Sequence, residues 1–214
     1  VVVGLRIVDA MGIREREPSI LAAGALLVPS TGVFDVARWF RVAEGLLYEQ
    51  GAMVLKNTPV VGMEPKGQGV RVETGTRGKV LARYVVNAAG LHADKIASMV
   101  GNPGFRIAPR RGEYWLFDKN LQGMVTRPLF TAPTPISKGV VVTPTADGNI
   151  MAGPNAENID DPDDTSTTAE GLEKVWDGAL SLVPCLQRRS AITNFAGLRA
   201  ASFPQADFII GPMP

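Results

Sequence analysis

Tyr84-Val-Val-Asn-Ala-Ala-Gly90 is the stretch of sequence that decides the expected fold class. Its apolar residues do not alternate with polar ones, which is typical of a strand buried on both faces of a parallel sheet. Small residues follow at its end, where a ligand or another backbone can approach closely. Ligands gather at this end of the strands in open α/β sheets, so the stretch suggests a dinucleotide contact. From spacing alone, a buried strand that turns tightly into a helix is the commoner arrangement.

The segment before this stretch contains the clearest helical pattern of the chain. We expect a helix over residues 36–50, with Asp35 as its N-cap and Gly51 after its end. Apolar residues at helical spacing predict one buried stripe, formed by Val36, Phe40, Ala43 and Leu47. A second helix is expected over 93–100 and a third over 169–183, the last with Thr167 and Glu170 at capping-box spacing.

The remaining elements are predicted to be short strands rich in β-branched residues. They cover residues 3–8, 24–29, 53–56, 60–64, 70–74, 113–117, 139–143, 149–152, 192–198 and 208–210. Runs of strands with an occasional helix indicate an α+β unit with a largely antiparallel sheet. We therefore predict a nucleotide-binding α/β domain over 35–103 and a second, discontinuous domain over 1–34 and 104–206. Residues 207–214 would return toward the first domain.

Composition excludes several classes of protein. The 22 basic and 21 acidic residues give a net charge of +1, which provides no field that would favour nucleic acid or a membrane surface. The single cysteine, Cys185, excludes an internal disulfide and a multi-cysteine metal site, and it fits a reducing compartment. The longest apolar runs fall far short of the roughly 20 residues that span a bilayer. The chain begins without methionine and stops just after a strand-like segment, so we expect an internal piece of a longer protein.

Five motifs occur in an order that resembles a known family. They are Gly51–Gly62, Ala88-Ala-Gly90, Pro109-Arg-Arg-Gly-Glu-Tyr114, Phe195-Ala-Gly-Leu-Arg199 and Asp207–Gly211. The set is similar to the D-amino-acid-oxidase superfamily of FAD-dependent oxidoreductases, especially its glycerol-3-phosphate-dehydrogenase-like branch. This resemblance implies a fold that combines part of a Rossmann-like FAD-binding domain with a substrate domain built on a mostly antiparallel sheet.

The resemblance also implies roles for individual residues. Val60 matches a position whose backbone binds the FAD adenine, and Ala88, Ala89 and Gly90 match the turn beside the dinucleotide. Arg199 matches an arginine that lies over the flavin and binds the anionic group of the substrate. Arginine presents a planar fork of donors suited to carboxylate or phosphate. Without the family, an ordinary ion pair at a sheet edge would be the commoner role for Arg199.

Three departures from the family pattern limit what this chain can do alone. It has no Gly-x-Gly-x-x-Gly turn, which would place pyrophosphate at a helix N-terminus. The segment that cradles the flavin ring in relatives would begin after Gly211. Many relatives have proline after the key arginine, where this chain has Ala200, so the substrate class stays open. We expect FAD in the parent protein and none in this chain alone.

Other candidates are weaker. His92, the only histidine, could act as a base, but it is expected to be partly exposed and inert. Arg110 and Arg111 could add positive charge near the substrate or be solvated, and Arg111 belongs to the family-like Arg-Gly pair. Tyr114 could face the active site or the core. The acidic run at residues 160–164 lacks calcium-loop spacing and reads as a solvated loop.

The expected function is hydride transfer from a small anionic hydroxy substrate to flavin. Glycerol 3-phosphate is the first choice, followed by a 2-hydroxy acid such as L-2-hydroxyglutarate and then a small amino acid. Electrons would pass to a quinone or another acceptor. We expect a cytoplasmic location, with peripheral association with the inner face of the membrane as the alternative, and self-association through an exposed sheet edge. The competing class is a non-catalytic folded piece or a binding module.

Overall fold

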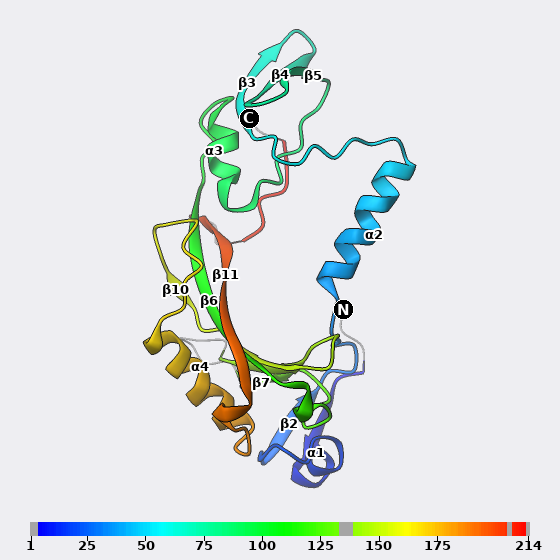
Figure 1. Cartoon of the computed structure of the whole chain (residues 1–214), viewed down its shortest axis with the longest axis vertical. Coiled ribbons are helices and arrows are strands. Elements are labelled where there is room, and N and C mark those ends of the chain that lie inside the picture. Colours follow the sequence, from blue (N-terminus) through cyan, green and yellow to red (C-terminus); the bar gives the residue numbers. More distant parts are fainter. Residues whose placement is uncertain (1–3, 133–138, 205–206, 213–214) are drawn as a thin grey trace. The chain divides into compact units, whose positions relative to one another are not determined.

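The computed structural model describes residues 4–132, 139–204 and 207–212 (Figure 1). Contacts divide the chain into two compact units. Unit 1 comprises Val1–Ala37, Arg111–Glu157 and Asp164–Gly197, and unit 2 comprises Arg38–Arg110, Asn158–Asp163 and Leu198–Pro214. The chain passes between the units several times. The assignment of these units to a nucleotide-binding and a substrate domain stays a prediction.

A sheet of six strands organises unit 1, although residues 106–110, 158 and 198–203 of its strands are assigned to unit 2. The strands are β6 (Arg106–Phe117), β7 (Leu129–Phe130), β8 (Val141–Pro144), β9 (Ile150–Gly153), β10 (Glu157–Asn158) and β11 (Ala191–Phe203). The strand order is β10-β6-β9-β8-β7, and β11 pairs with β6. The pairs β6/β9, β7/β8 and β8/β9 are antiparallel, which confirms the antiparallel sheet expected from the sequence.

Helix α4 (Ala169–Leu182) covers one face of this sheet in unit 1 (Figure 1). Val175 of the helix and Val142 and Ile150 of the sheet are each at most 1% exposed. Phe117 adds an aromatic contact with Trp176, with ring centroids 6.3 Å apart. Burying a side chain of this size stabilises the fold by about 1.5–3 kcal/mol, so the sheet face under α4 is the core of unit 1.

The N-terminal part of unit 1 is a two-stranded hairpin with a helix in its connection. Strands β1 (Arg6–Asp9) and β2 (Gly24–Leu27) are antiparallel, and α1 (Ala10–Arg16) follows β1. The carboxylate of Asp9 caps α1 by accepting a hydrogen bond from the backbone of Gly12 at 2.9 Å. The helix ends before Pro18, because the residue before proline avoids the helical region. Val3, the first residue of the expected strand, lies outside the described residues.

Unit 2 contains a three-stranded antiparallel sheet and two helices. The strands are β3 (Val60–Lys66), β4 (Gly69–Thr74) and β5 (Gly78–Ala82), and the helices are α2 (Val36–Glu49), whose first two residues belong to unit 1, and α3 (Ala93–Ser98). A short 3-10 turn, Gly90–His92, leads into α3.

The predicted parallel strand at residues 84–88 is wrong. These residues form no strand, and Tyr84 and Val86 are each 88% exposed. A strand requires a neighbour for its backbone N–H and C=O groups, and none of the described strands pairs with this segment. The strands predicted over 53–56 and 208–210 are wrong for the same reason.

The predicted buried stripe of α2 is also wrong. Val36, Phe40 and Leu47 are 53%, 62% and 47% exposed, and α2 buries no residue. The helix itself matches the prediction closely, because its periodicity and its length are local properties. Burial of the apolar stripe requires a surface opposite it, and the described residues provide none.

The helix interiors allow a direct test of packing. A Cβ on Gly178 of α4 would lie 2.5 Å from the Val140 side chain, whereas a Cβ on Gly45 of α2 would meet nothing within 4 Å. We expect Gly178→Ala to lower the free energy of unfolding by roughly 1–2 kcal/mol, because overpacking outweighs the gain in helix propensity. Gly45→Ala should instead stabilise by up to about 1 kcal/mol. Urea unfolding followed by circular dichroism measures both, and equal effects would contradict the packing of α4.

Candidate functional site

The candidate site is built on β6 and β11, which lie beside each other. The guanidinium of Arg106 lies 5.8 Å from the ring centroid of Phe203, and the rings of Tyr114 and Phe195 lie 5.1 Å apart. Each contact joins a residue near the start of one strand to one nearer the end of the other. The two strands are therefore antiparallel.

Successive side chains of β6 point to opposite faces of the sheet. The indole of Trp115 donates a hydrogen bond to the Leu172 carbonyl of α4 at 2.9 Å, so odd-numbered residues of this part of β6 face α4. Tyr114 points to the other face, where its ring stacks on Phe195 at an interplanar angle of 12°. Burial raises the pKa of the Tyr114 phenol, so its hydroxyl stays protonated at neutral pH. Its role on the substrate side stays a prediction.

Arg199 lies in the last part of β11, in unit 2, and is exposed. Within the described residues its guanidinium takes part in no hydrogen bond and no ion pair. An arginine held by a strand and left without a partner can bind an anion from solution. This is the property that the predicted substrate-binding role requires.

Arg111 has a different environment from Arg199. Its guanidinium is buried and donates to Glu157 at 2.7 Å and to Asp164 at 2.9 Å. The hydrogen bond to Glu157 raises the pKa of Arg111, and hydrogen bonds from Ser166, followed by the charge of Arg111, lower the pKa of Asp164. Because both terminal nitrogens of its guanidinium bind partners within the protein, Arg111 is not included in the proposed anion site.

Glu113 is a buried residue that sequence reasoning missed. Its carboxylate is fully buried and accepts hydrogen bonds from the amide of Asn155 and from both the backbone and the hydroxyl of Thr168. A Cβ at Gly171 would lie 1.4 Å from this carboxylate, so only glycine fits there. The sequence signal that could have revealed Glu113 is its position, because this charged residue shares a strand face with the apolar residues Trp115 and Phe117.

Thr168, and not the predicted Thr167, is the N-cap of α4. Its hydroxyl accepts a hydrogen bond from the backbone of Gly171 at 3.0 Å. The hydroxyl of Thr167 donates instead to Asn194 at 2.9 Å. The helix starts at Ala169, as predicted, and only the capping residue differs. Glu113 accepts a hydrogen bond from the backbone of Thr168, a long-range contact that the local sequence does not reveal.

The residues predicted to bind FAD lie in unit 2. Val60 begins β3 beside an irregularity in its pairing with β4, and the backbone of Gly75 donates to Pro59 at 3.0 Å. Farther along, Asn87 holds the turn over residues 88–90, donating to Ala93 at 2.7 Å and accepting from Ala89 at 3.3 Å. Ala88, Ala89 and Gly90 are exposed, and Gly90 has a φ of +57°. Their contact with FAD stays a prediction.

The remaining candidates have ordinary surroundings. His92 and Cys185 are exposed, and Cys185 lies 3.9 Å from the Ser19 carbonyl. The acidic run at 160–164 contains Asp164, which binds Arg111 and so is not simply solvated. Among the described residues, no group of His, Cys, Asp or Glu side chains could hold a metal ion, and no helix is long and apolar enough to cross a membrane.

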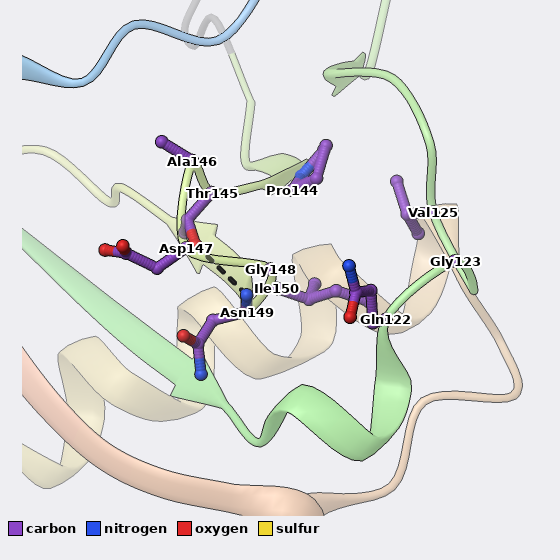
Figure 2. Close-up of a pocket in the computed structure, with 10 residues that line it drawn as sticks. All are labelled: Gln122, Gly123, Val125, Pro144, Thr145, Ala146, Asp147, Gly148, Asn149 and Ile150. Carbon is purple, nitrogen blue, oxygen red and sulfur yellow. Dashed lines mark hydrogen bonds between the residues drawn. The ribbon is translucent and has the colours of Figure 1, made fainter.

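Figure 2 shows a hollow at the turn between β8 and β9, lined on its other side by Gln122. The backbone of Asn149 donates to Thr145 at 3.1 Å across the turn, and its amide donates to the Phe117 carbonyl at 2.8 Å. These polar groups hold the turn in place. Asp147 is the only charged side chain around the hollow, so the hollow offers little to a charged ligand.

Comparison with known proteins identifies the family. Residues 2–214 match the model of the DAO family, described as FAD dependent oxidoreductase. The chain belongs to this family of FAD-dependent oxidoreductases. It is 39% identical over 211 residues to glycerol 3-phosphate dehydrogenase of Caloramator mitchellensis, covering 96% of this chain and 43% of that protein. It is also 32% identical over 151 residues to L-2-hydroxyglutarate dehydrogenase of Escherichia coli, covering 69% of this chain and 36% of that protein.

A solved structure has the same fold. The FAD-bound L-α-glycerophosphate oxidase of Mycoplasma pneumoniae superimposes with a TM-score of 0.86 at 24% identity, covering 98% of this chain and 56% of that chain. The present chain thus spans less than half the length of the curated relatives it matches. The resemblance inferred from five ordered motifs is confirmed.

The Glu113 network predicts a specific loss of stability. We expect Glu113→Gln to lower the free energy of unfolding by about 1–3 kcal/mol, because the new amide places a donor against the donors of Thr168 or Asn155. Asn155 cannot flip to compensate, since its carbonyl oxygen already accepts from the Glu113 backbone at 2.7 Å. Glu73→Gln on the surface of β4 is the control and should change stability by less than about 0.5 kcal/mol. Urea titration measures both, and equal small losses would show that the network contributes nothing.

Proposed function

We propose that this chain is part of a flavoprotein that oxidises a small anionic hydroxy substrate, with glycerol 3-phosphate as the first choice. The observation that carries the proposal is the exposed guanidinium of Arg199, which has no partner among the described residues of a chain from the FAD-dependent oxidoreductase family. The dehydrogenase from Caloramator mitchellensis supports the choice of substrate. A 2-hydroxy acid such as L-2-hydroxyglutarate is the second candidate, supported by the Escherichia coli relative, and a small amino acid is the third.

The described residues fit FAD in part. The exposed turn at 88–90 leaves its backbone open, and no atom lies within 4 Å of the position that a Cβ of Gly90 would occupy. The sequence has no Gly-x-Gly-x-x-Gly turn for the pyrophosphate. When bound, FAD supplies the hydride acceptor of the reaction. Val60 would contact the adenine through its backbone, and Ala88, Ala89 and Gly90 would lie beside the dinucleotide.

The protein's own contribution is to bind and orient the substrate. Arg199 would hold the anionic group with a bidentate pair of hydrogen bonds, which fixes both the distance and the direction of the substrate. Tyr114 would present a neutral hydroxyl on the open face of the sheet in unit 1, held in position by its stack on Phe195. No described residue is assigned as the catalytic base.

The electron acceptor, the location and the oligomeric state are part of the proposal. Electrons would leave to a quinone or another acceptor. A cytoplasmic location is consistent with one exposed cysteine and no internal disulfide. Self-association is supported by the exposed apolar side chains of α2 and of residues 84–86.

The full-length protein tests the oxidoreductase proposal. We expect it to be yellow and its flavin to be bleached by glycerol 3-phosphate under anaerobic conditions. Arg199→Gln should raise the half-saturating concentration of substrate by about 10–100-fold, because a bidentate charge-assisted pair is lost. Arg77→Gln, in the turn between β4 and β5, removes an equal charge elsewhere in unit 2 and should have no effect. A flavin that glycerol 3-phosphate leaves oxidised would refute the choice of substrate.

The 214-residue chain tests the competing class, a non-catalytic folded piece. We expect it to hold no flavin after incubation with FAD and to scatter light as a species larger than a monomer. The expected reasons are the missing phosphate turn and the uncovered apolar surfaces. A visible flavin spectrum after gel filtration would contradict the first expectation, and a monodisperse monomer would contradict the second.

A further inference from the structure

Arg110 is a second exposed arginine on the strands that carry Arg199. It lies in β6, and its side chain points to the face opposite Arg111, because neighbouring residues of a strand alternate. Arg111 is occupied by Glu157 and Asp164. The guanidinium of Arg110 has no hydrogen bond and no ion pair with the described residues.

The pairing of β6 with β11 places Arg110 opposite Arg199. Arg106 meets Phe203 at the outer end of the antiparallel pair. Four residues inward from this contact lie Arg110 on β6 and Arg199 on β11. The stack of Tyr114 on Phe195 lies a further four residues along each strand, so no extra residue is inserted on either side.

Two like charges opposite each other on neighbouring strands destabilise a sheet. Proteins ordinarily avoid such pairs or place a carboxylate beside them. Glu113, the acidic residue nearest to Arg110 in sequence, points to the other face, and Glu157 and Asp164 bind Arg111 there. The small residues Ala108 and Ala201 are the next side chains on the same face in unit 2, so no bulky group from either strand fills the adjoining space.

We propose that Arg110 and Arg199 together form one anion site that takes a phosphate monoester in preference to a monocarboxylate. This inference rests on the proposed function and adds Arg110 as a second residue of the anion site, one that selects a phosphate monoester over a monocarboxylate. A phosphate monoester carries a charge of about −1.5 to −2 at neutral pH, which two guanidinium groups neutralise. A single carboxylate would leave one of the two arginines uncompensated. Three phosphate oxygens can also accept from both guanidinium forks, whereas a carboxylate has two.

Binding to the full-length protein tests this assignment independently of turnover. Isothermal titration compares glycerol 3-phosphate with L-lactate for the wild type, Arg110→Gln, Arg199→Gln and Arg106→Gln. We expect Arg110→Gln and Arg199→Gln each to weaken the binding of glycerol 3-phosphate by at least about tenfold. Arg110→Gln should change the affinity for L-lactate by less than about threefold. The control Arg106→Gln removes the same charge from the same strand and should leave both ligands unchanged.

The pH dependence provides a second readout. Phosphate monoesters lose their second proton near pH 6, so wild-type affinity for glycerol 3-phosphate should rise from pH 5 to pH 7. This rise should shrink in Arg110→Gln. Removal of the like-charge pair should leave the thermal midpoint without ligand equal to or above that of the wild type. If Arg110→Gln fails to fold, Arg110→Lys keeps the charge without the fork and should show an intermediate loss of glycerol 3-phosphate affinity.

The outcomes separate this inference from the proposed function. Unchanged binding of glycerol 3-phosphate in Arg110→Gln, with a loss in Arg199→Gln, would overturn the two-arginine site and leave the oxidoreductase proposal standing. Equal losses of affinity for glycerol 3-phosphate and L-lactate in Arg110→Gln would also overturn it, because Arg110 would then act only through its general electrostatic field. If the wild type failed to bind glycerol 3-phosphate or to be reduced by it, glycerol 3-phosphate would be excluded as the substrate.

Discussion

The carboxylate of Glu113 joins the sheet of unit 1 to its covering helix, and the arrangement of unit 1 depends on this contact. A buried carboxylate is costly unless hydrogen bonds replace its water. Here Asn155 and Thr168 supply those bonds, and the N-terminus of α4 favours negative charge at the same point. Gly171 makes the approach possible, since any Cβ would occupy the position of the carboxylate. The helix is thereby fixed over one face of the sheet, and the opposite face keeps Tyr114 and Phe195.

Adjacent residues of β6 consequently have opposite tasks. Arg111 and Glu113 point into the covered side, where their charges are matched by fixed partners. Tyr114 points to the uncovered side and carries no such bonds to its hydroxyl among the described residues. Strand alternation alone separates a structural set from a set available to ligands, so a one-residue shift in register would exchange the two.

The local features of the fold could be read from the sequence. Helix α2 and helix α4 follow from 3.6-residue periodicity, and the β4 strand follows from alternation. Residues 84–88 could not be assigned correctly, because an apolar run signals burial without stating what buries it. The same limit applies to the stripe of α2 that includes Phe40. In both cases the missing information is whether a neighbouring surface covers the apolar residues, which the local sequence does not contain.

Arg199 became a candidate only because it could be matched to a family position, and its role stays a prediction. The difference between Arg110 and Arg111 could not be obtained that way, because the two are adjacent, identical in type and both near a strand start. Family resemblance pointed to Arg111, which is buried and paired with Glu157 and Asp164 in the structure. Three-dimensional pairing points to Arg110, since only that residue shares a face with Arg199 across β6 and β11. A family-like charged residue that is buried and paired within the protein therefore indicates a role in the fold. An exposed charge that has no partner and lies opposite a like charge indicates a place for a ligand.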